Sequence, residues 1–392
     1  MIKVILSVDR RIELENLSLY IHIPFCKKKC YYCDFPSYSG KEGLIDDYVL
    51  ALKKEIQLYA ADLRDYKIQT IFIGGGTPSI LKGNQIQEIM DCIKNNYNLD
   101  KNIEVSMEAN PGILDMEKLE IYYNSGINRL SIGLQACQNN LLISLGRIHS
   151  YEDFYKNLQD ARTVGFDNIS VDLMFGLPHQ RMMDWKKSLE NIIKLDVPHI
   201  STYSLIVEEG TPFYQWTESG KINRLSEELE LEMYHGAISY LKSNGYNHYE
   251  ISNFAQKGYS CRHNETYWKN QSYLGLGSAA HSYFQKSRFS NFTDIQKYIE
   301  YINLGKKPID IRTNPSIKDE ISETMFLGLR MMEGISIEDF KKRFNKSPFD
   351  IYEKKFHILN EKKLLTWDEN HIYLTPKGID LANIVFQEML LD

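Results

Sequence analysis

Three cysteines near the start of the chain have a spacing that suits metal chemistry. The stretch YIHIPFCKKKCYYCDF carries Cys26, Cys30 and Cys33 in the order C-x3-C-x2-C, directly after an apolar run. Thiolates are soft metal ligands and good nucleophiles, and the lysines at 27–29 favour loss of the thiol protons. The chain has six cysteines in 392 residues, so this grouping indicates a metal or redox centre rather than a disulfide framework.

The number of cysteine ligands limits which types of metal centre are possible. Structural zinc sites close with four ligands, usually from two cysteine pairs far apart in the sequence, and no second pair is present here. Cys92 and Cys137 each stand alone in helical or loop stretches, as small core residues do. A zinc site completed by His22 or Asp34 is one interpretation. The other is an iron–sulfur cluster in which one iron has no protein ligand.

Polar residues follow several other apolar runs. The segment 74–78, Gly-Gly-Gly-Thr-Pro, lacks the lysine of a phosphate-binding loop, so it is typical of a strand-to-helix turn with Thr77 as N-cap. Its glycines would also let a ligand approach the backbone and bond to its amides. Asp172 interrupts the apolar stretch SVDLMF, where a parallel strand is normally buried on both faces. Asp172 and Glu108 are therefore candidates for binding a cationic ligand.

The elements that must position these residues can be predicted from hydrophobic periodicity. Short apolar runs predict strands at 17–23, 69–75, 103–109, 128–135, 168–175 and 199–207. Amphipathic stretches between them predict helices, among them 44–60, 84–97 and 182–195. Such βα repeats predict an α/β fold with a parallel sheet, curled into a partial (βα)6 barrel or a full one. Working residues in these folds lie at the carboxyl ends of the strands, so the candidates should meet on one face.

The rest of the chain has a different pattern. We divide the sequence into a barrel core (1–210), an extension of the barrel (211–309) and a C-terminal domain (310–392). The extension begins with a predicted helix at 225–245 and continues as an aromatic, irregular region to about residue 300. Helices at 319–332 and 336–344, a hairpin and a helix after Pro376 then resemble a winged-helix α+β unit. We expect that unit to cover the barrel rather than bind DNA, because the chain is acidic.

Composition excludes several classes of partner. The net charge is -6 and the pI is near 6.0, so neither nucleic acid nor an anionic membrane is an expected partner. No apolar run approaches the roughly eighteen residues of a membrane span, which predicts no integral membrane segment. Asp9, Arg10 and Arg11 interrupt the first apolar stretch, so residues 1–15 do not resemble a signal peptide. We expect a cytoplasmic protein.

Several motifs together resemble a known family. The cysteine spacing, with an aromatic residue before the third cysteine, resembles the signature of the radical S-adenosylmethionine (SAM) superfamily. Six motifs follow one another in an order that resembles the oxygen-independent coproporphyrinogen III oxidase family, over most of the chain. They are LYIHIPFCKKKCYYCDF, GGGTP, EANP, GLQ, GRIHS and VDLMFGLP. The resemblance implies a [4Fe-4S] cluster on Cys26, Cys30 and Cys33, SAM on the fourth iron, and an electron donor if SAM is cleaved. It also implies SAM contacts from Tyr20, Tyr32, Gly75, Gly76, Thr77, Glu108, Gln135, Arg147 and Asp172.

Three features distinguish this sequence within that family. Phe35 stands where the oxidases have a further cysteine, and only about sixteen residues precede the first strand. Both features, and the segment CRHNETYW at 261–268, resemble a haem-chaperone branch. That resemblance implies transfer of haem to acceptor proteins and haem binding by His263, Tyr267 and Trp268, with Cys261 as a weaker candidate ligand. The alternative is a radical SAM coproporphyrinogen III oxidase, and no catalytic residue is assigned.

Overall fold

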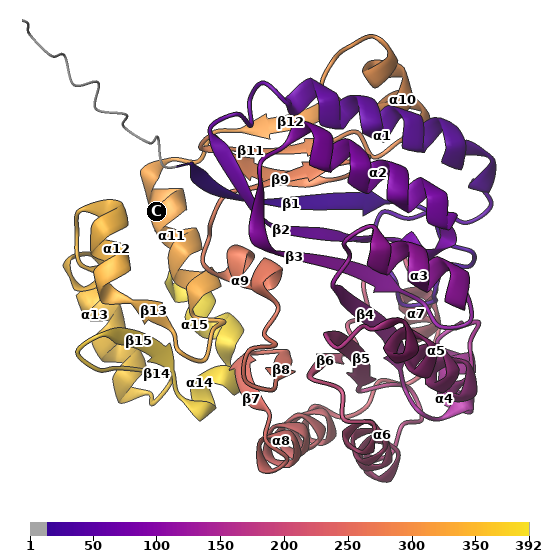
Figure 1. Cartoon of the computed structure of the whole chain (residues 1–392). Coiled ribbons are helices and arrows are strands. Elements are labelled where there is room, and N and C mark those ends of the chain that lie inside the picture. Colours follow the sequence, from indigo (N-terminus) through magenta and orange to yellow (C-terminus); the bar gives the residue numbers. More distant parts are fainter. Residues whose placement is uncertain (1–13, 392) are drawn as a thin grey trace, which may run out of the picture.

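A continuous twelve-stranded sheet forms the centre of the main body (Figure 1). The computed structural model describes residues 14–391, so the expectation about a signal peptide at the start of the chain lies largely outside the described residues. Six neighbouring strands are parallel, which confirms the predicted α/β fold with a parallel sheet. They are β1 (Glu15–Ile23), β2 (Tyr66–Gly75), β3 (Leu99–Ala109), β4 (Arg129–Gln135), β5 (Ile169–Phe175) and β6 (His199–Ser204).

Helices cover the outer face of this sheet (Figure 1). The main ones are α1 (Ile45–Tyr59), α2 (Gly83–Asn96), α3 (Met116–Asn124), α5 (Tyr151–Val164), α6 (Met182–Lys194) and α8 (Glu227–Ser243), with short helices α4 (Asn139–Ser144) and α7 (Pro212–Glu218) between them. In α1 the buried residues Tyr48, Leu52 and Ile56 recur every fourth position and face the sheet. All seven residues of β4 are buried, as expected for a strand covered on both faces.

The region between residues 245 and 300 is not irregular, so that prediction was wrong. It contains β7 (Asn247–Glu250), β8 (Asn253–Ala255), α9 (Arg262–Trp268), β9 (Tyr273–Leu276), β10 (His281–Phe284), β11 (Ser287–Asn291) and α10 (Ile295–Asn303), followed by β12 (Ile309–Thr313). The β7–β8 pair extends the sheet beyond β6, and β9 pairs parallel with β1. Strands of three to five residues are too short to show an alternating pattern.

The C-terminal domain has its own small sheet and its own core. Strands β13 (Ile335–Ser336), β14 (Leu365–Trp367) and β15 (His371–Leu374) pair antiparallel. The helices around them are α11 (Ile317–Gly328), α12 (Ile337–Phe344), α13 (Pro348–Glu361), α14 (Pro376–Asp380) and α15 (Ala382–Glu388). Phe340, Tyr352 and Phe356 are at the centre of this core. The predicted α+β unit is confirmed, although the sequence pattern did not predict α13.

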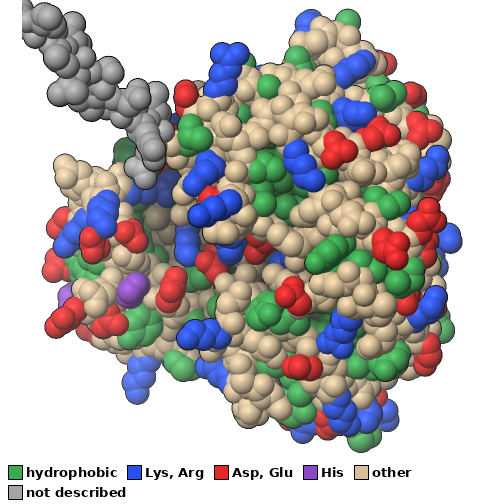
Figure 2. Space-filling model, viewed as in Figure 1, with side chains coloured by type: hydrophobic (Ala, Val, Ile, Leu, Met, Phe, Trp, Pro, Cys, Tyr) green, Lys and Arg blue, Asp and Glu red, His purple; other side chains and the backbone are tan. Residues whose placement is uncertain are grey.

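The face of the molecule seen in Figure 2 carries charges of both signs. Figure 2 shows acidic and basic side chains interspersed over the visible face of both the barrel and the C-terminal domain. Such a surface does not resemble the basic stripe of a nucleic-acid-binding domain. Within residues 14–391, no helix has the length and hydrophobicity needed to cross a bilayer.

Candidate functional site

The three motif cysteines lie in one loop between β1 and α1. The Cys26 amide donates to the carbonyl of Tyr38 at 2.9 Å, and the Cys33 amide donates to the carbonyl of Cys30 at 3.2 Å. The pKa of the Cys33 thiol is raised to about 11, first by burial and to a smaller extent by the neighbouring Cys30 and Cys26. The three sulfur atoms therefore share one electrostatic environment at the carboxyl edge of the barrel.

Two side chains donate hydrogen bonds to the cysteine sulfurs. The Thr77 hydroxyl donates to Cys26 Sγ at 3.4 Å, and Arg147 Nη1 donates to Cys30 Sγ at 3.5 Å. Asn110 connects these donors, because its Nδ2 donates to Thr77 Oγ1 at 2.9 Å and its Oδ1 accepts from Arg147 Nη2 at 2.7 Å. Donors aimed at sulfur favour the thiolate and tune a bound cluster. Asn110 belongs to the EANP segment at the carboxyl end of β3, which was expected at this face, but no role was predicted for it.

Thr77 does not cap the helix that it precedes. It occupies the N-cap position of the short 3-10 helix Pro78–Ile80, but its side chain makes no bond to that helix. The hydroxyl is engaged by Cys26 and Asn110 instead. The interpretation of Thr77 as a simple N-cap was therefore wrong, because the tertiary contacts compete successfully for the hydroxyl.

The donor set fits a cluster better than a single ion. Within residues 14–391, no three His, Cys, Asp or Glu side chains converge closely enough to surround one metal ion. His22 is not free to complete a zinc site, since Nδ1 bonds to the Tyr20 hydroxyl at 3.0 Å and Nε2 to the Pro36 carbonyl at 2.8 Å. A [4Fe-4S] cluster also needs its cysteine sulfurs close together, but each thiolate binds a different iron, so three cysteines without a fourth protein ligand suit it.

The glycine loop after β2 packs against the cysteine loop. The amide of Gly76 donates to the carbonyl of Ile23 at 2.9 Å, and that of Thr77 donates to Phe25 at 2.8 Å. A Cβ atom on Gly76 would lie 2.7 Å from the Phe25 carbonyl oxygen, so only glycine allows this approach. The Gly75 amide donates to Glu108 Oε2 at 3.0 Å. In this structure these three amides are bonded within the protein, and ligand binding by this loop stays a prediction.

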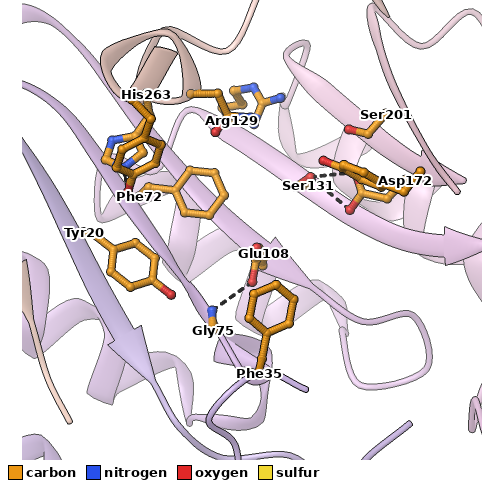
Figure 3. A pocket seen from close by; sticks show the side chains of 13 residues that line it. Tyr20, Phe35, Phe72, Gly75, Glu108, Arg129, Ser131, Asp172, Ser201 and His263 are labelled. Carbon is orange, nitrogen blue, oxygen red and sulfur yellow. Dashed lines mark hydrogen bonds between the residues drawn. The ribbon is translucent and has the colours of Figure 1, made fainter. Parts of the chain in front are cut away.

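A cavity of about 310 Å³ lies inside the barrel (Figure 3). It is lined by Tyr20, Phe35, Phe72, Gly75, Glu108, Arg129, Ser131, Asp172, Ser201, Tyr203, His263, Asn264 and Tyr267. Burial raises the pKa of Glu108 to about 7, and the charge of Asp172 adds to this effect. Burial also raises the pKa of Asp172, whose Oδ1 accepts from the Ser131 hydroxyl at 3.1 Å. Two carboxyl groups in so enclosed a space suit a ligand with positive charge and hydroxyl groups.

The predicted SAM residues fall into two groups. Tyr20, Gly75, Glu108 and Asp172 line the cavity. Tyr32, Gly76, Thr77 and Arg147 lie instead around the cysteine loop. Gln135 ends β4 with a left-handed φ of 73°, beside a break in the register with β5. The strand ends thus lie on one face of the sheet, but the predicted side chains form two layers. The inner layer lines the cavity, and the outer layer surrounds the cysteine loop.

Helix α9 closes the amino end of the barrel. The side chain of Glu104 on β3 accepts the backbone N–H of Arg262 and of His263, each at 3.0 Å. Thr266 bonds to Ser18 on β1 at 2.9 Å. Cys261 is fully buried, and its thiol lies 3.7 Å from Glu104 Oε1, so it faces protein rather than a ligand space.

His263 forms part of the cavity wall, with both ring nitrogens engaged. Nδ1 bonds to Thr70 Oγ1 at 2.8 Å, and Nε2 bonds to the Tyr267 hydroxyl at 2.8 Å. The imidazole stacks on Phe72 with 5.2 Å between ring centroids. Burial lowers the pKa of His263 to about 3, and the positive charge of Arg129 lowers it further. The imidazole is therefore neutral, as a metal ligand must be, but Nε2 becomes available only when Tyr267 moves.

Trp268 points away from His263 and Tyr267. Successive helical residues differ by about 100° in direction, so Tyr267 and Trp268 cannot line the same side of α9. The indole lines a second cavity, of about 520 Å³, between α9 and the C-terminal domain. The Arg330 guanidinium lies over its ring, 4.3 Å from the centroid. Tyr267 and Trp268 therefore line different cavities, and haem binding by these two residues stays a prediction.

Comparison with known proteins assigns the family. Two family models match the sequence, the Radical SAM superfamily over residues 20–192 and the HemN C-terminal domain over residues 316–381. The protein named Heme chaperone HemW from Bacillus subtilis is 39% identical over 374 residues, which cover 95% of this chain and 99% of that protein. The chain belongs to the HemW family of the radical SAM superfamily. The Heme chaperone HemW of Lactococcus lactis is 37% identical, with 96% of this chain and 97% of that protein covered.

A solved structure confirms the fold of this HemW family member. Coproporphyrinogen III oxidase (HemN) from Escherichia coli, a radical SAM enzyme, superposes with a TM-score of 0.84 over 97% of this chain and 91% of that chain. The two sequences are 22% identical, so the likeness concerns the fold alone. The α/β barrel followed by a C-terminal domain is thus shared between the HemW family and HemN.

Proposed function

We propose that this chain is a haem chaperone that binds haem and passes it to acceptor proteins. Its HemW relatives are named heme chaperones, and they align with nearly the whole length of this chain. The observation that carries the proposal is that His263 and Tyr267 line the same cavity as Glu108 and Asp172. A metal-ligating imidazole and a carboxylate pair suited to SAM are thereby brought together in one barrel.

The cluster and SAM sites follow from the donor sets. Cys26, Cys30 and Cys33 would hold a [4Fe-4S] cluster, which supplies one electron for cleavage of SAM when both are bound. Glu108 and Asp172 would pair with the cationic groups and ribose hydroxyls of SAM. The remaining proposed contacts are Tyr20, Tyr32, Gly75, Gly76, Thr77, Gln135 and Arg147. Thr77 and Arg147 act through the sulfur atoms that they contact, at 3.4 and 3.5 Å.

The haem site centres on α9. We assign His263 Nε2 as the iron ligand, reached when the Tyr267 hydroxyl turns away from it. Tyr267 would then flank the macrocycle, whereas Trp268 would stabilise α9 against the C-terminal domain through Arg330. An imidazole on a short helix, held at its N-terminus by a carboxylate, keeps its orientation during this exchange.

The second candidate function is oxygen-independent coproporphyrinogen III oxidase. The shared fold with HemN favours it, but fold alone does not decide chemistry. Phe35 argues against it, because its side chain, 60% exposed, lines the cavity where the oxidases have a further cysteine. No catalytic residue is assigned to this reaction.

One experiment separates the two functions. Protein with a reconstituted cluster would be titrated with haem under anaerobic conditions, with and without SAM, and assayed with coproporphyrinogen III. Stable one-to-one haem uptake without turnover would support the chaperone. Steady formation of protoporphyrinogen would reject it in favour of the oxidase.

Location, partners and domain division complete the proposal. We place the protein in the cytoplasm, with haem-acceptor proteins as partners, an electron donor if SAM is cleaved, and no nucleic acid. The working units are the barrel core (1–210), its extension (211–309) and the C-terminal domain (310–392). The extension supplies α9, so the haem residues belong to the segment that joins the other two units.

A further inference from the structure

Arg129 is a buried cation with few partners. It begins β4, and only 2% of its surface is exposed. Its one hydrogen bond runs from Nη1 to Ser106 Oγ at 3.5 Å, and Nε has no partner. Among residues 14–391, none of the ion pairs within 4.0 Å includes Arg129. Leaving guanidinium donors without partners inside a protein is unfavourable, so such a group is expected to serve a ligand.

The neighbouring carboxylates form no hydrogen bond or ion pair with the Arg129 guanidinium. Glu104 and Asp172 lie near enough to raise the pKa of Arg129. Both oxygens of Glu104 already accept from the N-terminus of α9. Asp172 accepts from Ser131. These carboxylates form no hydrogen bond to Nη1 or Nη2, so the guanidinium is left for a group from outside the chain, and its paired donors match a carboxylate.

The strand register places Arg129 deep in the barrel. Tyr20, Phe72, Ser106 and Arg129 are register partners across β1 to β4. Gln135 ends the same strand six residues later, which at about 3.3 Å per residue is roughly 20 Å nearer the carboxyl edge. The cysteine loop lies at that edge. A carboxylate bound directly against the cysteines would therefore lie farther from Arg129 than one bound within the cavity that Arg129 lines.

We propose that Arg129 binds a carboxylate of the ligand inside the barrel, and that this carboxylate is a propionate of haem. This inference rests on the proposed haem-binding function. The other source of a carboxylate is the methionine portion of SAM, which the depth of Arg129 disfavours. The structure thus assigns the buried Arg129 guanidinium to the recognition of haem.

The cavity has an aromatic wall that complements this polar anchor (Figure 3). Tyr20 stacks on Phe72 with centroids 6.4 Å apart, and Phe72 stacks on His263 at 5.2 Å. Figure 3 shows the Arg129 guanidinium between this wall and the side of the cavity that carries Ser131 and Asp172. A flat macrocycle would lie against the wall, extend toward the mouth, and direct one propionate to Arg129.

The test compares haem with haem dimethyl ester, which lacks the propionate charges. We expect the unaltered protein to bind haem at least about tenfold more tightly than the ester, because a charge-assisted bidentate contact is lost. Arg129→Gln should bind both compounds equally, and Arg129→Lys should retain part of the preference for haem. Arg181→Gln is the matched control, since Arg181 is 70% exposed and pairs with Asp184. Binding would be followed by absorption spectroscopy, after circular dichroism has shown that each variant is folded.

Three outcomes would overturn the proposal in distinguishable ways. If the unaltered protein binds haem but does not prefer it over the ester, the role of Arg129 is rejected, and this comparison needs no variant. If Arg129→Gln weakens binding of SAM but not of decarboxylated SAM, the assignment to haem is rejected in favour of the SAM carboxylate. If the unaltered protein binds no haem at all, the proposed function itself fails.

Discussion

The Tyr267 hydroxyl lies 2.8 Å from Nε2 of His263, one helical turn away on α9. This bond occupies the nitrogen that we assign to haem iron. Tyr267→Phe should therefore raise haem affinity about fivefold, because a neutral hydrogen bond of this kind is worth about 1 kcal/mol. Spectroscopic haem titration would measure the change. A loss of affinity would contradict it and identify the tyrosine oxygen as the ligand.

Tyr273→Phe provides a control for that substitution. Tyr273 contacts the Tyr267 ring edge-on, with centroids 4.7 Å apart. No hydrogen bond connects it to His263 among the described residues. Its change to phenylalanine should leave haem affinity unaltered.

Glu108 should make the ligand-free protein less stable as the pH rises. Burial raises its pKa from 4.5 to about 7. The folded protein therefore holds a proton that the unfolded chain releases, so the favourable contribution is complete below pH 4.5 and is lost as the pH rises through about 7. Glu108→Gln should raise the melting temperature at pH 8 and leave it unchanged near pH 4.5. The exposed substitution Glu117→Gln serves as control, and an equal gain at both pH values would exclude this cause.

Thr77 should tune a bound cluster rather than hold it. Thr77→Val removes the donor to Cys26 Sγ but keeps the shape of the side chain. We expect cluster content to be retained and the midpoint potential to become more negative, because the hydrogen bond stabilises the more negative reduced state. Redox titration followed by electron paramagnetic resonance would measure this. Thr163→Val, on the exposed face of α5, should leave the potential unchanged.

Arg330 should be important for stability. Its Nη2 lies 3.5 Å from Oε2 of Glu250, whose side chain is fully buried. Arg330→Met would leave that carboxylate without its cation, and removal of one partner of a buried pair costs about 3 kcal/mol. Thermal unfolding would show this loss, and Glu250→Gln in the same chain should restore most of it. Additive losses in the double variant would contradict the pairing. Lys342→Met, at an exposed pair with Glu338, should produce no measurable change.

The sequence predicted the parts of the site that obey local rules. Thr77, Glu108 and Asp172 could be found because they follow or interrupt apolar strands. Arg129 could not be found in this way, because it lies at the amino end of β4 and the rule concerns the carboxyl ends of strands. Its importance comes from burial and from the lack of partners, which only the tertiary structure reveals.

The motif at 261–268 shows where reasoning from neighbouring residues in the sequence fails. Residues that are adjacent in the sequence suggested one shared binding surface, but α9 directs Trp268 to a different cavity from His263. The short strands between 245 and 300 were missed for a related reason. Their pairing with β1 and β6 depends on partners distant in the sequence, and no local pattern records it.

The seven residues of α9 contact the barrel interior on one side and the C-terminal domain on the other. Tyr267, whose hydroxyl must leave Nε2 of His263 for the proposed haem binding, directly precedes Trp268, whose indole lies against Arg330. The proposed haem site and the C-terminal domain are thus connected through one short helix.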